Sequence, residues 1–266
     1  MSALLRRLAL LVEYDGTSYA GSQLQANGPS IQAELERAIM ELTGAFARVA
    51  FAGRTDAGVH AAGQIACFDT RTVYNCEAFV GGINVRLPET IAVHAARDVD
   101  LNFDPRRRAV SRCYCYSIVN CATRTPLRRG RAWRVAVQLD VEKMRAAARL
   151  LLGEQDFAAF AAAEASGSST KRCIQRLCVR QSGAEVSVEI TANAFLMHQV
   201  RRTVAALVDV GSGRLPIDGF ERHLRDARPG SYGRSAPAHG LCLMSVIYAT
   251  PLFETKREMI GHNEDV

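Results

Sequence analysis

The residues of this chain with the clearest chemical potential lie in one short stretch, Gly-Arg-Thr-Asp-Ala-Gly-Val-His, at positions 53–60. It carries one carboxylate, Asp56, close to the cation of Arg54. A carboxylate can act as a nucleophile or a base, and a nearby guanidinium favours its ionised form. Its two glycines permit tight turns and close approach of a ligand. A purely structural interpretation stays open, because Thr-Asp-x-Gly is also common turn chemistry.

The apolar periodicity of residues 1–104 predicts the elements that position this stretch. In order, we expect a strand at about 8–14, a helix at 31–43, strands at 48–52 and 63–70, a helix at 76–84 and a strand at 91–98. Ser30 is a suitable N-cap for the first helix, and Gly44 a suitable stop. Asp56 should therefore lie on a loop between two strands, held by a rigid sheet.

Residues 105–250 repeat this order. We expect a strand at about 110–119, a helix at 141–152, strands at 172–181 and 185–192, a helix at 195–210, an extra helix at 216–227 and a strand at 241–248. Each half then reads β-α-β-β-α-β, the ferredoxin-like (RRM-like) order. The sequence thus predicts an α+β protein whose halves, 1–104 and 105–250, form a continuous, mainly antiparallel sheet around a central basic cleft. Residues 251–266 are expected to be a polar tail.

The charge balance favours a nucleic-acid partner. Lys and Arg total 33 against 27 acidic residues, a net charge of +6, and only three of the 33 are lysines. Arginine presents a planar fork that suits phosphate and stacks on bases. A GC-rich genome is the alternative explanation, because it also raises the arginine content. The basic residues cluster at 106–108, 124–134, 171–180 and 201–202.

Other classes of protein are disfavoured. The apolar run at 8–12 is shorter than the roughly 7–15 residues of a secretory core, and nothing approaches a membrane span, so we expect a cytoplasmic protein. The eight cysteines include no C-x-x-C pair, which predicts reduced, mostly buried thiols. The histidines lack zinc-ligand spacing, so no metal is expected. A thiol or zinc enzyme is the weakest alternative.

The stretch GRTDAGVHA closely resembles the catalytic loop of the tRNA pseudouridine synthase A family. Further family landmarks occur in the expected order: LALLVEYDGTSYAGSQLQ from 8, Ser-Ile-Gln at 30–32, Phe-Asp-Pro-Arg at 103–106, Ser-Arg-Cys-Tyr-Cys-Tyr at 111–116, Gly-Glu-Gln-Asp-Phe at 153–157, the run at 193–201 and Ala-Pro-Ala-His-Gly-Leu at 236–241. They extend from about residue 8 to 248. Two departures are Ser22, where the family usually has Trp, and the small, uncharged loop 161–169.

The resemblance implies an isomerase that detaches uracil from C1′ of its ribose, rotates it and rejoins it through C5, on the 3′ side of the anticodon stem-loop of tRNA. It implies no cofactor. Asp56 would be the nucleophile or the base, and whether it attacks the sugar or gives a glycal-type intermediate stays open. Tyr114 would stack on the target base, Arg201 would pair with Asp56, and Arg54 would help to hold the base out of the stack.

The same resemblance suggests further partners. Arg106 and Arg112 are expected to contact phosphates, and Phe103, Arg107 and Arg172 are further expected RNA contacts. The family works as a homodimer in which both subunits contact each tRNA, so we expect a homodimer here. For His60 a structural role in the loop is favoured over a chemical one. The main alternative function is a non-catalytic tRNA-binding protein of the same fold.

Overall fold

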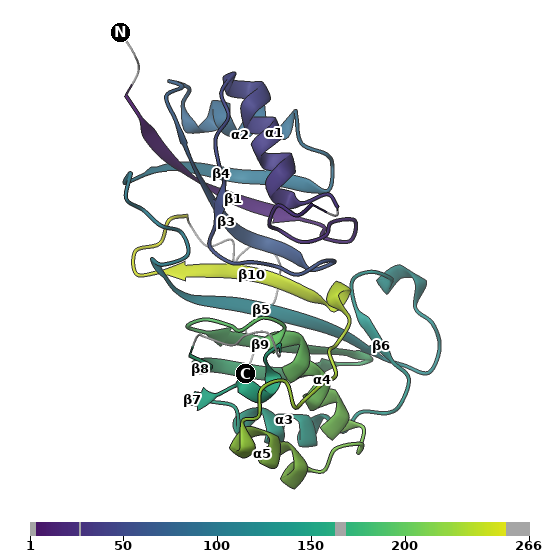
Figure 1. The fold of residues 1–266 in the computed structure, drawn as a ribbon. Coiled ribbons are helices and arrows are strands. Elements are labelled where there is room, and N and C mark those ends of the chain that lie inside the picture. Colours follow the sequence, from purple (N-terminus) through teal and green to yellow (C-terminus); the bar gives the residue numbers. More distant parts are fainter. Residues whose placement is uncertain (1–3, 27, 163–168, 254–266) are drawn as a thin grey trace.

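The computed structural model describes residues 4–26, 28–162 and 169–253. Its strands are β1 (Arg6–Tyr14), β2 (Ala50–Phe51), β3 (His60–Thr70), β4 (Ile91–Val99), β5 (Ala109–Asn120), β6 (Trp133–Val135), β7 (Gly153–Asp156), β8 (Lys171–Ser182), β9 (Glu185–Ala192) and β10 (Leu241–Tyr248). They form one sheet in the order β4-β1-β3-β10-β5-β9-β8-β7, with β2 paired to β3 and β6 to β5 (Figure 1). The β3–β10 and β5–β6 pairs are parallel and the other pairs are antiparallel. The predicted α+β, mainly antiparallel class is therefore confirmed.

The helices are α1 (Ile31–Thr43), α2 (Cys76–Asn84), α3 (Val141–Arg149), α4 (Gln199–Gly211) and α5 (Ile217–Asp226). One buried apolar cluster runs through both halves and joins alternate strand residues, such as Leu10 and Val188, to helix residues such as Leu35 and Val204. Intervening strand residues, including Cys67, belong to a smaller cluster. Within the described ranges, no helix has the length and apolar character needed to cross a membrane.

Several predicted boundaries agree with the structure, and others are wrong. Helices 31–43 and 76–84 and strands 185–192 and 241–248 are confirmed to the residue. The helix expected from 195 begins only at Gln199, because His198 adopts a left-handed backbone (φ 63°) that a right-handed helix cannot include. Most of the family landmark at 153–157, where the apolar periodicity predicts no strand, forms β7 and pairs with β8. Most of the expected polar tail, residues 254–266, lies outside the described residues, as does most of the small loop, residues 163–168.

The two halves of the chain meet where β10 lies between β3 and β5 (Figure 1). β10 pairs along most of its length with β5, but its register with β3 covers only Cys242↔His60 and Leu243↔Ala61. Just beyond this short ladder, Gly63 faces β10 so closely that a Cβ there would lie 2.4 Å from the carbonyl oxygen of Met244. The absence of a side chain at Gly63 is therefore a condition for this approach of the two strands.

We predict that Gly63→Ala lowers the free energy of unfolding by about 1–3 kcal/mol, the usual cost of forcing atoms into a packed interior. Gly81→Ala is the matched control, because a Cβ on this α2 residue meets nothing within 4 Å and alanine is favoured over glycine in a helix by about 0.5–1 kcal/mol. Urea unfolding of both variants measures the difference. Equal stabilities would contradict the close contact of β3 with β10.

Candidate active site

The stretch around Asp56 forms the connection from β2 to β3, at the junction of the two halves. Asp56 makes an isolated antiparallel bridge with Gly21, in the loop that precedes α1. Gly21 has a φ of +131°, and a Cβ there would lie 2.9 Å from the carbonyl oxygen of Thr55. Gly58 also has a positive φ, +76°. Glycine is thus required on both sides of this contact, and the backbone of Asp56 is held in place.

Arg201, in the first turn of α4, reaches the carboxylate of Asp56. Its Nη1 donates to Oδ2 of Asp56 at 3.2 Å, and its Nε donates to the carbonyl of Ala236 at 2.8 Å. His198 Nε2 lies 3.6 Å from the same Oδ2. Among the described residues no hydrogen bond reaches Oδ1, and the Asp56 side chain is 30% exposed. One carboxylate oxygen is therefore held, while no described residue bonds the other.

Tyr114 lies beneath this loop, on β5. It is buried, and its ring meets that of Phe195 edge-on with centroids 5.2 Å apart. Burial raises the pKa of the Tyr114 phenol far above its usual range, and the nearby negative charge of Asp56 acts in the same direction. The phenol is consequently protonated at neutral pH. The structure thus brings Tyr114, Asp56 and Arg201 together, as expected, while their roles in the reaction stay predictions.

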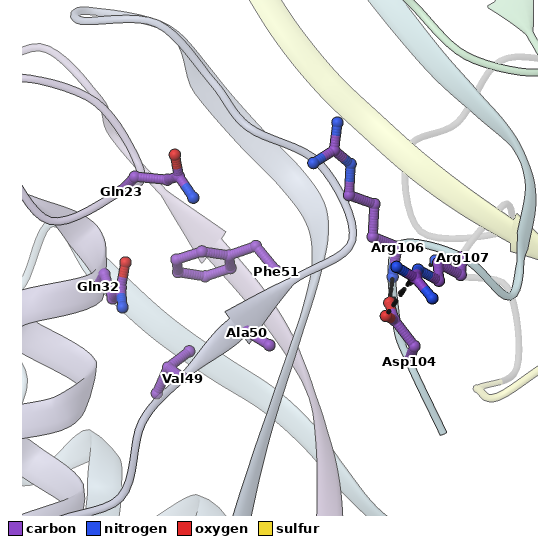
Figure 2. A pocket seen from close by; sticks show the side chains of 8 residues that line it. All are labelled: Gln23, Gln32, Val49, Ala50, Phe51, Asp104, Arg106 and Arg107. Atoms are coloured by element: carbon purple, nitrogen blue, oxygen red, sulfur yellow. Dashed lines mark hydrogen bonds and ion pairs between the residues drawn. The ribbon is translucent and has the colours of Figure 1, made fainter. Parts of the chain in front are cut away.

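The exposed arginines differ in their surroundings. Arg54 points to solvent, and no described residue bonds its guanidinium. Arg106 and Arg107 border a cavity of about 380 Å³ (Figure 2). Arg107 forms a loose ion pair with Asp104 at 3.7 Å, while Arg106 keeps its guanidinium without a described partner. The cavity is lined by Gln23, Gln32, Val49, Ala50, Phe51, Asp104, Arg106 and Arg107.

Arg112 has a different environment from the one expected of a phosphate ligand. Its buried guanidinium donates to the backbone carbonyls of Ala52 (3.0 Å), Asn193 (2.9 Å), Arg106 (2.6 Å) and Ala109 (3.3 Å). Burial lowers the pKa of this group from its usual high value. These bonds join the end of β2 to β5 and to the segment after β9. The predicted phosphate contact stays a prediction, beside a structural role that the sequence did not indicate.

The two remaining expected RNA contacts are also tied to the protein. Phe103 is half-buried and packs on Tyr248 with ring centroids 5.4 Å apart. Arg172 donates to the carbonyls of Ser169 (2.7 Å) and Lys171 (2.6 Å). Neither of them contacts Asp56, so the structure leaves their expected RNA contacts as predictions.

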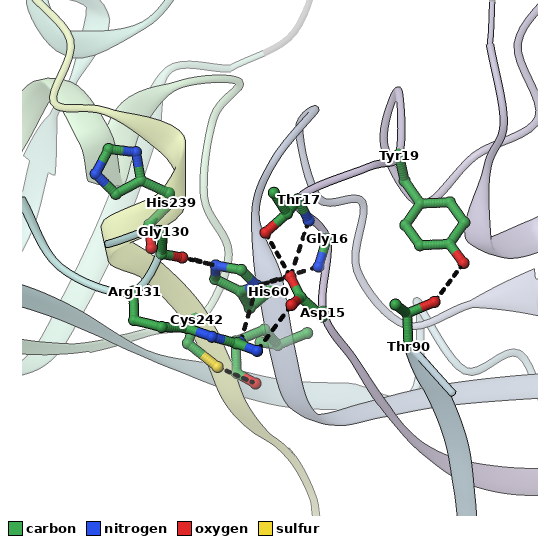
Figure 3. Close-up of polar contacts among 11 residues, drawn as sticks. Asp15, Gly16, Thr17, Tyr19, His60, Thr90, Gly130, Arg131, His239 and Cys242 are labelled. Atoms are coloured by element: carbon green, nitrogen blue, oxygen red, sulfur yellow. Dashed lines mark hydrogen bonds and ion pairs between the residues drawn. The ribbon is translucent and has the colours of Figure 1, made fainter. Parts of the chain in front are cut away.

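His60, the last residue of the motif, connects the two halves (Figure 3). Its Nε2 lies 3.0 Å from the carbonyl oxygen of Gly130, and its Nδ1 lies 3.0 Å from Oδ1 of Asp15. Arg131 donates to the other oxygen of Asp15 at 2.8 Å. Desolvation would raise the pKa of Asp15, but bonds from Thr17 and the charges of Arg131 and His60 outweigh it and lower that pKa. The bonds around the buried His60 agree with the structural interpretation of this residue.

Sequence reasoning assigned no role to His198 or to a second acidic site. The only signal for His198 was its place within the family landmark at 193–201. Asp209, also on α4, accepts hydrogen bonds from Arg214 (2.8 Å), Tyr232 (2.6 Å) and Arg234. Although desolvation opposes them, these bonds lower the pKa of Asp209. The cluster fastens the segment that carries Ala236, and thereby the carbonyl that orients Arg201.

The cysteines form no disulfide: all eight are free. Only Cys67 is fully buried, so the expectation of mostly buried thiols is wrong in degree. Cys113, Cys115 and Cys242 lie on central strands, on the opposite sheet face from neighbours such as Tyr114 and Leu243 that enter the main core. Among the described residues, no group of three or more His, Cys, Asp or Glu side chains is arranged to hold a metal ion.

Comparison with known proteins bears directly on this geometry. A family model described as tRNA pseudouridine synthase matches residues 10–106 and 147–249, ranges that include Asp56 and Arg201. The chain belongs to the tRNA pseudouridine synthase A family. It is 47% identical over 243 residues to tRNA pseudouridine synthase A of Myxococcus xanthus, covering 91% of this chain and 92% of that protein. The resemblance inferred from the motifs is therefore confirmed.

Other tRNA pseudouridine synthase A proteins match to a similar extent. That of Geobacter sp. (strain M21) is 39% identical over 245 residues, 92% of this chain and 99% of the relative. That of Neisseria meningitidis serogroup C (strain 053442) is 44% identical over 216 residues, 81% of this chain and 82% of the relative. Family membership thus rests on nearly full-length matches. Tyr114 and Arg112 fall between the two ranges of the family model.

We predict that Arg112→Lys lowers the free energy of unfolding by about 1–3 kcal/mol, because a lysine cannot reproduce the planar fork and leaves buried carbonyls unpaired. Arg107→Lys is the control, since the Arg107 side chain is 88% exposed and surface changes usually stay within about 0.5 kcal/mol. Denaturant unfolding measures both. A neutral Arg112→Lys would show that the four carbonyl contacts contribute nothing to stability.

Proposed function

We propose that this chain isomerises uridine to pseudouridine in tRNA, with Asp56 as the group that allows the glycosidic bond to break. The observation that carries the proposal is the asymmetric carboxylate of Asp56: Oδ2 is paired with Arg201, and no described residue bonds Oδ1. The names of the nearly full-length relatives support the same reaction. A carboxylate that is held through one oxygen and unbonded at the other is suited to act as nucleophile or base.

The reaction conserves all atoms. The bond between N1 of uracil and C1′ of ribose breaks, the base rotates, and a new bond joins C5 to C1′; C5 loses a proton and N1 gains one. Oδ1 of Asp56 can attack C1′, or it can take a proton from the sugar to give a glycal-type intermediate. Arg201 serves both routes, because it holds Oδ2 of Asp56 and its own bond to the carbonyl of Ala236 fixes the direction from which it approaches.

The surroundings of Asp56 support recognition of an extruded nucleotide. Tyr114 provides an aromatic group under the loop, and its raised pKa keeps the phenol neutral beside a base. Arg54 is exposed next to Asp56, where a long planar side chain can occupy the gap that an extruded base leaves. Arg106 extends into solvent with a free guanidinium at the rim of the cavity in Figure 2 and is suited to phosphate.

We further propose that the chain consists of two ferredoxin-like halves around a basic cleft. Two strand orders support this: β4-β1-β3-β2 in the first half and β10-β5-β9-β8 in the second place equivalent strands in equivalent positions. A homodimer in the cytoplasm, with both subunits on one tRNA, is part of the proposal. Light scattering of the free protein and of its tRNA complex tests the dimer.

In the competing function, a tRNA-binding protein without catalysis, Asp56 is only a turn-forming residue and its negative charge is not required. We predict that Asp56→Asn abolishes pseudouridine formation and leaves tRNA affinity nearly unchanged. Asparagine keeps the size and the turn-forming hydrogen bond but removes the negative charge and the nucleophile. Tritium release from C5-labelled uridine in tRNA measures turnover, and filter binding on the same preparation measures affinity.

Asp15→Asn is a matched control for Asp56→Asn, since Asp15 also pairs with an arginine, Arg131, but lies in the His60 cluster. If Asp15→Asn still forms pseudouridine, the loss of a carboxylate paired with an arginine does not by itself abolish activity. Substantial turnover by Asp56→Asn, on protein shown by mass spectrometry to be free of deamidation, would end the catalytic assignment.

We also predict that Arg106→Ala weakens binding of all tRNA substrates alike and makes the slope of log K against log salt shallower by about one. The reason is that one phosphate contact, with its released counterion, is lost. Arg37→Ala is the control, because Arg37 lies on α1 in ion pairs with Glu34 and Glu41. Identical salt slopes for both variants would remove Arg106 from the RNA surface.

A further inference from the structure

The residue that precedes Asp56 is bonded on three sides, by groups to which the reaction assigns no role. We infer that Ser22 is a positioning residue for the reaction: through Thr55 it fixes the backbone from which Asp56 reaches the substrate. The inference rests on the proposed role of Asp56 and adds to it the means by which this chain holds that residue.

Ser22 bonds both backbone groups of Thr55. The amide of Thr55 donates to Oγ of Ser22 at 2.9 Å, and the amide of Ser22 donates to the carbonyl of Thr55 at 3.1 Å. Ser22 is fully buried, so water cannot replace its hydroxyl. Its own carbonyl accepts from the amide of Gln32, in the first turn of α1, at 2.9 Å. The loop is thereby tied to a helix rather than to another loop.

The side chain of Thr55 is held from the opposite direction. Its hydroxyl is 2.8 Å from that of Tyr14, and Gln64 Nε2 lies 3.4 Å from the same tyrosine oxygen. Thr55 and Tyr14 are both buried, and burial raises the pKa of Tyr14 to about 12, so this hydroxyl stays protonated. We call the three bonds of Thr55, two to Ser22 and one to Tyr14, the Thr55 anchor.

The Thr55 anchor matters because Asp56 is the next residue. The backbone of Asp56 itself is restrained by the bridge to Gly21, the neighbour of Ser22, and by the bond that its carbonyl accepts from the amide of Val59 at 3.1 Å. Loss of the Ser22 hydroxyl leaves the buried amide of Thr55 without an acceptor, and the loop must move to find one. A carboxylate displaced by about 1 Å from its reacting atom can cost about a hundredfold in rate.

The test is the kinetics of Ser22→Ala with tRNA. We expect kcat to fall by about ten- to a hundredfold, with KM and tRNA affinity within about twofold of the parent, because binding depends on arginines elsewhere. Thr70→Val is the matched control. Thr70 is also buried, and its hydroxyl accepts a backbone N–H, that of Thr72 at 3.1 Å, but it lies at the far end of β3. Its kcat should stay within about twofold of the parent even if stability falls.

A second pair of variants covers a failure of Ser22→Ala to fold. Tyr14→Phe removes the other side of the Thr55 anchor. Tyr19→Phe removes a part-buried bond of similar length, from the Tyr19 hydroxyl to that of Thr90 at 2.7 Å, that does not involve Thr55. We expect Tyr14→Phe alone to lower kcat severalfold at unchanged KM. Thermal melting of all variants, with assays well below each midpoint, separates rate from stability.

The outcomes are distinguishable when Asp56→Asn is measured in the same series. Turnover by Asp56→Asn overturns the proposed role of Asp56 and this inference with it. An inactive Asp56→Asn, combined with Ser22→Ala and Tyr14→Phe that match their controls in kcat, overturns the role of the Thr55 anchor alone. A selective fall of kcat in either variant supports it.

Discussion

The ion pair between Asp56 and Arg201 is the contact on which the rest of the site depends, because its partners come from different halves of the chain. Each partner is held by a separate support: the bridge to Gly21 for Asp56, and the carbonyl of Ala236 for Arg201. A partly buried pair is useful only if both charges are held in good geometry. The sheet junction, the loop before α1 and the Asp209 cluster can all be understood as supports for this one contact.

The arginines of this chain fall into two kinds that the sequence does not separate. The guanidinium of Arg112 donates its hydrogen bonds to backbone carbonyls and connects distant segments. Arg214 and Arg234 likewise bond within the protein, to Asp209. Arg54 and Arg106 are exposed, and no described residue bonds their guanidinium groups. The net charge of +6 is therefore a poor measure of how strongly the protein attracts RNA. Some arginines stabilise the fold, and only the solvent-exposed arginines can bind phosphates and release counterions.

Local signals explain what could be predicted. Apolar spacing predicted α1 and α2, with Ser30 as the expected cap of α1. The structure adds an N-cap at Asn75 for α2, and both helices have the expected bounds. Strands β6 and β7 were missed because they are short and exist only through pairing with β5 and β8. The Asp56–Arg201 pair came from the family resemblance. The carbonyl environment of Arg112 and the left-handed backbone of His198 depend on contacts far along the chain, which no local pattern encodes.

The position of β10 has a consequence for biosynthesis. During translation, β3 is complete long before the segment 241–248 leaves the ribosome. Until then, its edge facing β10 is paired only with the two-residue strand β2, at Ala66 and Cys67. The first half must therefore exist for a time with a largely open central edge, a state in which sheets are prone to pair with other chains. The nascent enzyme also cannot assemble its site early, since Arg201 and Ala236 arrive with the same late segments. Activity is thus delayed until β10 and the segments before it have been synthesised.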